Sequence, residues 1–283
     1  MDWGTRLVDG ERIDRSCSGA FSSRCRCGGR SRCCLARGAR CGHDEGSPTF
    51  SSWAGDFKSG LASVGLTTDQ GLVGFRFNEP SDPWTLGKIN GFLGDTVLVG
   101  IDFRVQNGQL CGVGENGGIY SLNSGARAVK ISQLTITLQG QHFGVDFNPA
   151  ANRLRVISDT GQNLRHNIDD PAAPLTTTPD GTLTNPTTPP SIALGVTGAA
   201  YTNNDLNTAT ATTLFDIDTV NDRVACSFPP MPAPSHPPIA WASTKDRQLA
   251  STSTASQRLH QPRLATLRTS GKYRSYRVNI RNG

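Results

Sequence analysis

Two short phrases recur along the middle of the chain at a spacing of about 45 residues, and this period limits the folds open to the sequence. The first phrase is a brief apolar run after a Gly, Asn or Thr turn, and its copies begin at Leu72, Ile119, Leu164 and Leu214. The second begins with glycine and ends in Phe or Tyr, with copies at Gly100, Gly144 and Gly198. Two phrases with one period indicate a single structural unit copied in tandem.

Each copy consists of short apolar or alternating runs separated by turn residues, which is the pattern of β-strands. Asn107-Gly108 and Asn116-Gly117 are strong hairpin signals, because both residue types tolerate positive φ. The content of 31 Gly and 17 Pro is also typical of a turn-rich β protein. We expect strands over residues 97–103, 109–114, 118–122, 144–147, 153–157 and 163–168.

Several strands within each copy match a β-propeller blade better than a solenoid coil. We therefore predict an all-β chain that contains an incomplete β-propeller-like repeat domain with disordered N- and C-terminal flanks. An ordinary β-sandwich, whose strands resemble one another by chance, is the alternative.

Charge and composition divide the chain into three parts. The net charge of +5 arises in the two flanks, because the patterned middle is acidic. Residues 1–61 are predicted to be a disordered or aberrant N-terminal segment, residues 62–226 a repeat domain of about four units, and residues 227–283 a disordered tail that is Pro-rich and then basic. The basic flanks lack a recognisable nucleic-acid motif, and no apolar run approaches the roughly 18 residues of a membrane helix. We expect no nucleic acid partner and no membrane span.

Six of the eight cysteines lie in the first 50 residues, where they superficially resemble a zinc site. Cys25-Arg-Cys27 and Cys33-Cys34 lack the paired C-x₂₋₄-C spacing that zinc modules use. No signal peptide in this frame places the segment in a compartment where disulfides form. We therefore predict neither a metal site nor a disulfide framework in this segment.

The phrases Phe143–Pro149, Arg153–Arg165 and Gly198–Asn204 resemble the bacterial and plant family catalogued as domain of unknown function 4394. The resemblance covers roughly residues 64–224. It implies a propeller-like repeat domain without assigned chemistry that is extracellular or in the cell envelope. Members usually begin with a signal peptide and continue through a further repeat. This chain shows neither in frame, so we hypothesise that both flanks are frame-shifted or mis-spliced, which the genomic sequence would decide.

Asp102 and Asp146 stand two residues after the glycine of the second phrase, and Ala200 takes that place in the third copy. A repeated aspartate in β-repeats commonly accepts backbone hydrogen bonds at a turn. The alternative is a ring of carboxylates that holds Ca²⁺, but such a site requires six or more oxygens and this ring is incomplete. We assign structural roles to the aspartates and to the glycines of this phrase.

Short polar side chains are concentrated in the turn after Ser158, between two predicted strands. The alternation along the first of these strands places Arg153 and Arg155 on one face and Leu154 and Val156 on the other. The turn is either a tight hairpin or a ligand-binding loop to which His166 adds a donor. The candidate ligand-binding residues are Arg155, Asp159, Thr160, Gln162, Asn163 and Arg165.

Two classes of function follow. We favour a non-catalytic scaffold that binds a small molecule, glycan or peptide, without a cofactor, and that self-associates through an open sheet edge. The alternative is a propeller-type hydrolase or lyase that uses the carboxylates of Asp146 and Asp159, with Arg165 as electrophile. Two carboxylates close together over a pocket would favour the enzyme, whereas carboxylates that cap backbone groups would favour the scaffold.

Overall fold

The computed structural model describes residues 3–7, 62–76, 79–202, 205–207, 209–227, 239–240, 248–250, 263–269 and 272–278. Side chains are described over residues 63–76, 82–202, 205–207 and 209–227. All regular elements in these stretches are β-strands, and the described part of the chain contains no helix. The all-β prediction is confirmed.

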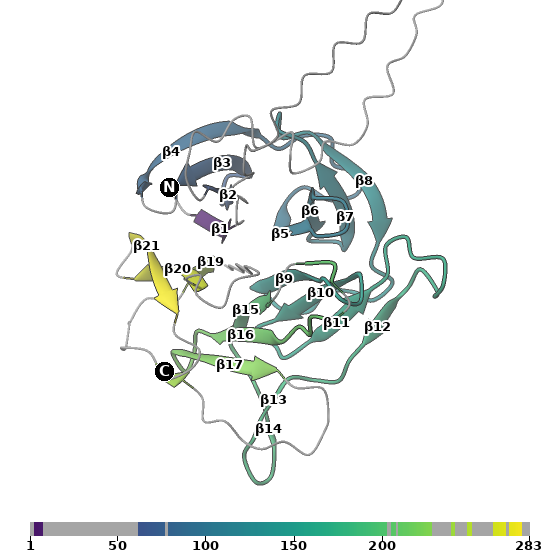
Figure 1. The fold of residues 1–283 in the computed structure, drawn as a ribbon, viewed down its shortest axis with the longest axis vertical. Helices are drawn as coiled ribbons and strands as arrows, with labels where there is room; N and C mark the ends of the chain where they lie inside the picture. Colours follow the sequence, from purple (N-terminus) through teal and green to yellow (C-terminus); the bar gives the residue numbers. More distant parts are fainter. Residues whose placement is uncertain are drawn as a thin grey trace, which may run out of the picture. The chain divides into compact units, whose positions relative to one another are not determined.

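The strands form antiparallel sheets in which neighbours along the chain are also neighbours in the sheet (Figure 1). The first sheet contains β1 (Trp3–Leu7), β2 (Ala62–Thr67), β3 (Gly71–Arg76) and β4 (Glu79–Lys88). The second contains β5 (Leu98–Arg104), β6 (Gln109–Gly114), β7 (Gly118–Leu122) and β8 (Ala128–Gln133). The third contains β9 (Phe143–Asn148), β10 (Arg153–Ser158), β11 (Asn163–His166) and β12 (Thr177–Pro179).

The chain continues with the hairpin of β13 (Thr184–Asn185) and β14 (Ser191–Ile192). The next four-stranded sheet contains β15 (Val196–Tyr201), β16 (Leu214–Asp218), β17 (Arg223–Ser227) and β18 (Ile239–Ala240). A three-stranded sheet follows, with β19 (Gln248–Ala250), β20 (Arg263–Thr269) and β21 (Lys272–Val278). Among the described strands, none pairs with a strand of another sheet.

The hairpins form where turn chemistry favours them. Gly108 has φ of 64° between β5 and β6, and the Asn107 side chain accepts a hydrogen bond from the Gln109 N–H at 3.0 Å. Gly117 has φ of 83° between β6 and β7. These conformations suit glycine, because a side chain there would be strained. The strands predicted at 109–114 and 118–122 are found with those bounds.

The pleat of each strand sends alternate side chains into different interfaces between sheets. Leu154 and Val156 of β10 pack in an apolar cluster with Val113 of β6. Ile157 joins a separate cluster with Leu214 of β16. The β9–β12 sheet therefore has one face toward the β5–β8 sheet and the other toward the β15–β18 sheet.

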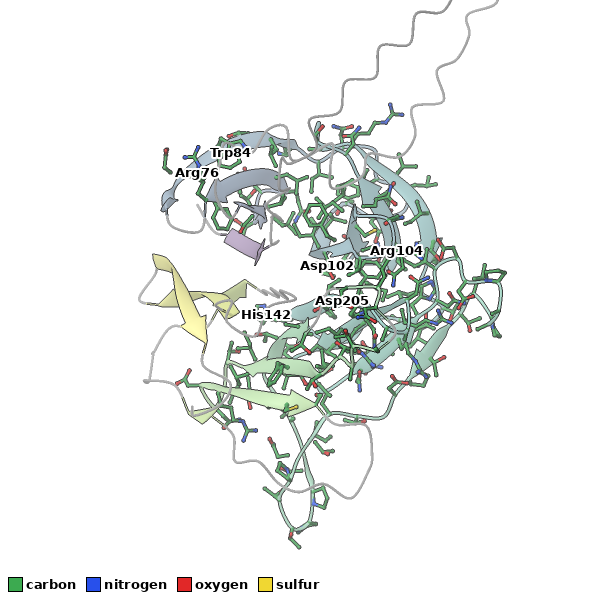
Figure 2. The ribbon with its side chains drawn as sticks, in the orientation of Figure 1. Arg76, Trp84, Asp102, Arg104, His142 and Asp205 are labelled. Atoms are coloured by element: carbon green, nitrogen blue, oxygen red, sulfur yellow. The ribbon has the colours of Figure 1, made fainter. Side chains whose placement is uncertain are left out.

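The repeated aspartates connect successive sheets. Asp102 of β5 (Figure 2) accepts a hydrogen bond from the Phe147 N–H of β9 at 2.7 Å. Asp146 of β9 in turn accepts one from the Tyr201 N–H of β15 at 2.6 Å. Both aspartates are buried. Each carboxylate therefore satisfies a backbone group of the next sheet in the chain.

The glycines of the same phrase allow these sheets to approach closely. A Cβ on Gly144 would lie 2.6 Å from the backbone nitrogen of Ala199 on β15. A Cβ on Gly100 would lie 2.5 Å from a methyl group of Val145 on β9. The third glycine, Gly198, lies on β15 at a shift in strand register. Together, the glycine and the aspartate bring the first strand of one sheet against that of the next.

Substitution of Asp146 by alanine is expected to destabilise the protein by about 2 kcal/mol, because the buried Tyr201 N–H loses its acceptor. The matched control is Asp82→Ala, which changes an exposed aspartate on β4. Urea unfolding of the full chain, followed by circular dichroism, compares the two variants. Equal midpoints for both would contradict a structural role for the Asp146 carboxylate.

The first phrase is not equivalent in all four of its copies. Leu72, Ile119 and Leu164 lie on β3, β7 and β11, each the third strand of its sheet. Leu214 begins β16, the second strand of its sheet. The prediction for this fourth copy is therefore wrong. Second and third strands both bury alternate apolar residues, so the phrase does not distinguish them. The second phrase keeps its place on the first strands β5, β9 and β15.

The flanks contribute several described strands. β1 pairs with β2, β18 pairs with β17, and β19 to β21 form a sheet. These strands lie outside the predicted repeat domain of residues 62–226. The remaining residues of 1–61 and 227–283, for which we predicted disorder, lie outside the described residues, and disorder there stays a prediction.

Candidate functional site

Charged side chains meet in the interface between the β9–β12 and β15–β18 sheets. Arg155 on β10 donates from Nε to the Tyr201 hydroxyl on β15 at 3.1 Å. Its Nη1 donates to Asn163 Oδ1 at 2.6 Å and to Asp180 Oδ2 at 2.7 Å. Three partners therefore hold one guanidinium, and they come from both sheets and from the loop after β12.

Asp180 connects Arg155 to the surface. Its other oxygen lies 3.0 Å from Arg165 Nη2, and the Arg165 side chain is 45% exposed. The Asp180 N–H donates to the Asn163 carbonyl at 3.0 Å, which fixes the loop against β11. One carboxylate thus bridges a largely buried arginine and a half-exposed one.

Asp216 on β16 completes the group of residues that we call the Arg155 cluster: Arg155, Asn163, Arg165, Asp180, Tyr201 and Asp216. Asp216 is 3% exposed, and its Oδ2 accepts a hydrogen bond from the Ser227 hydroxyl. Its Oδ1 is buried and has no hydrogen-bond partner within the described part of the chain. A buried oxygen without a partner is uncommon, since almost all buried polar atoms are satisfied.

Burial raises the pKa of Asp216 from 3.8 to about 7, and the Ser227 hydrogen bond and the charge of Arg155 offset part of this effect. Burial also opposes the charge of Arg155, but the contacts with Tyr201 and Asp180 raise its pKa above the usual value. Asp216 therefore changes charge near neutral pH, while Arg155 stays charged.

The six predicted ligand-binding residues separate into two groups. Arg155, Asn163 and Arg165 belong to the Arg155 cluster. Asp159, Thr160 and Gln162 instead hold the loop that precedes β9. Asp159 Oδ1 accepts from the Gln141 N–H at 3.0 Å, and Gln162 exchanges hydrogen bonds with the backbone of Thr137 and Gln139 at 2.9 Å. Their polarity serves the connection between sheets.

The carboxylates suggested for catalysis are engaged by backbone groups. Asp146 accepts from the Tyr201 N–H and Asp159 from the Gln141 N–H. His166 is also removed from the Arg155 cluster. It is buried between the Ser132 and Thr177 hydroxyls, at 2.9 and 3.0 Å, and burial lowers its pKa to about 4.

Among the described side chains, no group of three or more His, Cys, Asp or Glu could hold a metal ion. The cysteine-rich segment of residues 17–41 lies outside the described residues. Cys111 is buried, and burial raises its pKa to about 12.

Within the described stretches we find no helix suited to crossing a membrane.

Sequence reasoning did not identify three members of the Arg155 cluster. Asp180 lies in the turn Pro179-Asp180-Gly181, a typical turn triplet, and gave no sign of an arginine partner. Tyr201 and Asp216 belong to the two repeated phrases, so we interpreted both as parts of the structural repeat. Their relation to Arg155 depends on how the two sheets pack.

Comparison with known proteins gave one family. A search of curated proteins found no match. The model of the family described as Domain of unknown function (DUF4394) matches residues 71–237. The match spans the β5–β8 and β9–β12 sheets and reaches beyond β17. The chain therefore belongs to the DUF4394 family.

Proposed function

We propose that the chain is a non-catalytic ligand-binding domain and that its Arg155 cluster binds a hydroxyl-rich ligand such as a glycan. The observation that carries this proposal is the Asp216 Oδ1, which lacks a partner among the described residues, near an arginine held by three hydrogen-bond partners. Local rules of packing are most often broken at functional sites, because the stability lost there is compensated by function. The two aspartates expected to favour an enzyme instead bind backbone groups.

The chemistry of the cluster suits hydroxyl groups. Arg165 has Asp180 as its ion-pair partner in the described residues, and Nη2 of Arg155 makes no hydrogen bond there. Guanidinium groups are donors only, and carboxylates are acceptors when ionised. A sugar hydroxyl satisfies both kinds of partner, since it donates one hydrogen bond and accepts others. Adjacent hydroxyls could therefore bind Arg165 and Asp180 at the exposed edge of the cluster.

The proposal extends to the arrangement and location of the domain. Successive four-stranded sheets joined by the Gly and Asp of one phrase support a propeller-like arrangement. With the family resemblance, they support an extracellular or envelope location. The genomic sequence upstream of residue 62 tests the location, because an export signal in another frame is expected there.

Replacement of Arg165 by glutamine is expected to weaken glycan binding at least tenfold, because a charged donor at the exposed edge is lost. A glycan array identifies the tightest ligand of the full chain, and titration calorimetry then measures its affinity. The matched control is Arg153→Gln on β10, since Arg153 is ion-paired with Asp170 outside the Arg155 cluster. No binding on the array, or equal losses in both variants, would overturn the proposal.

A further inference from the structure

The two carboxylates that flank Arg155 have unequal partners. Asp180 contacts both Arg155 and Arg165, so it would keep an arginine if Arg155 moved away. Asp216 has Ser227 as its hydrogen-bond partner, and its second oxygen has none among the residues that the structure describes. Asp180 therefore has two arginine partners at the edge of the interface, whereas Asp216 is buried inside it with a partner for one of its two oxygens.

Asp216 is placed to receive the guanidinium. Tyr201, which Arg155 contacts through Nε, is paired across the strands with Leu214, two residues before Asp216. Residues two apart on a strand share a face and lie about 7 Å apart. Arg155 therefore meets the face of the β15–β18 sheet that also carries Asp216, and its positive charge already acts on that carboxyl.

The balance between the two carboxylates depends on the proton of Asp216. While the carboxyl is neutral, it has little attraction for Arg155, and the guanidinium remains with Asp180. Once the O–H bond breaks and the proton passes to water, a buried anion with an unpaired oxygen remains. Such an anion is costly unless it is paired. The pair with Asp180 is more exposed and therefore weaker, since solvent screens it.

We propose that Arg155 exchanges its carboxylate partner, from Asp180 to Asp216, when Asp216 loses its proton, and that this exchange frees Asn163 Oδ1 and Asp180 Oδ2 at the edge of the interface. The exchange makes the ligand site of the proposed function dependent on pH, and only this consequence rests on that function. Arg155 keeps its charge throughout, and Arg165 retains Asp180.

Several other ionisable groups surround this pair. Tyr201 on β15 has its pKa raised, chiefly by burial, and Cys226 on β17 has its pKa raised by burial and by the charge of Asp216. Asp146 on β9 faces Tyr201, and Asp218 lies farther along β16, where Arg223 and the backbone N–H groups of the following turn hold it. Because Tyr201 and Cys226 stay protonated near neutral pH, Asp216 is the group that titrates in this range.

Nuclear magnetic resonance of the full chain with ¹⁵N-labelled arginine tests the exchange without any ligand. The Arg155 side-chain signal is assigned by its loss in Arg155→Lys and followed from pH 5 to pH 8.5. We expect one transition at or somewhat below pH 7, since pairing with Arg155 stabilises ionised Asp216. In Asp216→Asn the signal should stay at its low-pH position. In Asp180→Asn the transition should move to lower pH, because Arg155 no longer leaves a competing carboxylate when Asp216 ionises.

The signals of Arg153 and Arg104 are the internal controls. Arg153, which lies on the same strand as Arg155, is paired with Asp170. Arg104 (Figure 2) is paired with Asp169. The signals of both arginines should keep their positions in every variant that folds. An Arg155 signal that does not change with pH, or one that still titrates in Asp216→Asn, would overturn the exchange. A transition in a protein that binds no glycan would overturn the proposed function and leave the exchange supported.

Discussion

Replacement of Gly144 by alanine is expected to destabilise the protein by about 3 kcal/mol or more, because the new methyl group meets backbone atoms. The added Cβ would lie 2.6 Å from the Ala199 nitrogen and 2.8 Å from the Gly198 carbonyl carbon. Backbone atoms of a paired strand cannot rotate away, so β15 must move from β9. That movement would also break the hydrogen bond from the Tyr201 N–H to Asp146. Urea unfolding of the full chain measures the loss.

Two further glycines provide graded controls for this variant. A Cβ on Gly100 would meet side-chain atoms of Val145, the nearest being a methyl group at 2.5 Å, and no backbone atom, so Gly100→Ala should be destabilising but less so. A Cβ on Gly125 meets one atom, Asn123 Oδ1, at an ordinary 3.5 Å, so Gly125→Ala should leave the midpoint nearly unchanged. The expected order of destabilisation is Gly144, Gly100 and then Gly125. A Gly144→Ala protein as stable as Gly125→Ala would show that β9 and β15 do not pack this closely.

Replacement of Asp216 by asparagine is expected to stabilise the protein at pH 8 by about 2–4 kcal/mol and to change little at pH 4. Burial raises the pKa of Asp216 to about 7, against 3.8 in the unfolded chain. Below pH 3.8 both states hold the proton. As the pH rises toward 7, the unfolded chain ionises first and gains stability relative to the fold. Asparagine carries no charge, so the variant does not lose this stability as the pH rises. If Arg155 pairs with ionised Asp216, part of the cost is already offset, and the stabilisation at pH 8 should be nearer to about 2 kcal/mol than to about 4 kcal/mol.

The same substitution two residues farther along β16 should have the opposite sign. Asp218 is also buried, but its oxygens accept hydrogen bonds from Val220, Asn221 and Arg223. Asp218→Asn removes a charge that these donors stabilise, so it should lower stability at pH 8. Unfolding free energies of both variants at pH 4 and pH 8 make the comparison. A loss of stability in Asp216→Asn at pH 8 would mean that its carboxylate is well paired in the folded protein.

His166 also makes the stability of the protein depend on pH, and this effect is best seen when Asp216 is replaced by asparagine. Burial lowers the pKa of His166 from 6.5 to about 4, so the unfolded chain binds this proton more readily than the fold. The contribution of neutral His166 to the free energy of unfolding is therefore fully present above pH 6.5, and it is lost as the pH falls toward 4. Its slope opposes that of Asp216 over the same range. Stability in Asp216→Asn should consequently rise more steeply from pH 4 to pH 6.5 than in the unchanged protein.

Asp216 thus connects stability with the proposed binding. If the Arg155 cluster binds a ligand, the Asp216→Asn protein should be more stable at pH 8, and its ligand binding should no longer depend on pH through this group. Such a trade-off is typical of sites where a strained arrangement is kept for function.

Much of the secondary structure could be predicted because it depends on neighbours in the chain. The strands β6 and β7 follow from alternating or apolar runs beside Asn-Gly turns, and the two faces of β10 follow from the pleat. Leu214 was misplaced for the same reason. Its phrase has the local pattern of a strand, and a local pattern does not state which strand of a sheet it forms.

The candidate site could be predicted only in part. Arg155 was found because strand alternation places it on a polar face, and Asn163 and Arg165 were included for the polar groups that they add beside the turn. Asp159 and Gln162 were included for their polarity, but short polar side chains in turns often bind nearby backbone groups, as these do.

The amino-acid sequence by itself determined the strands, the turns between them and the face to which each strand directs its side chains, since these depend on φ preferences and a two-residue period. The tertiary structure decided which charges share an interface. Arg155 meets Tyr201 and Asp180 because two sheets pack face to face and a loop folds over their edge. The energy of a buried charge depends on the partners that surround it in space, and Asp216 lacks one for its second oxygen.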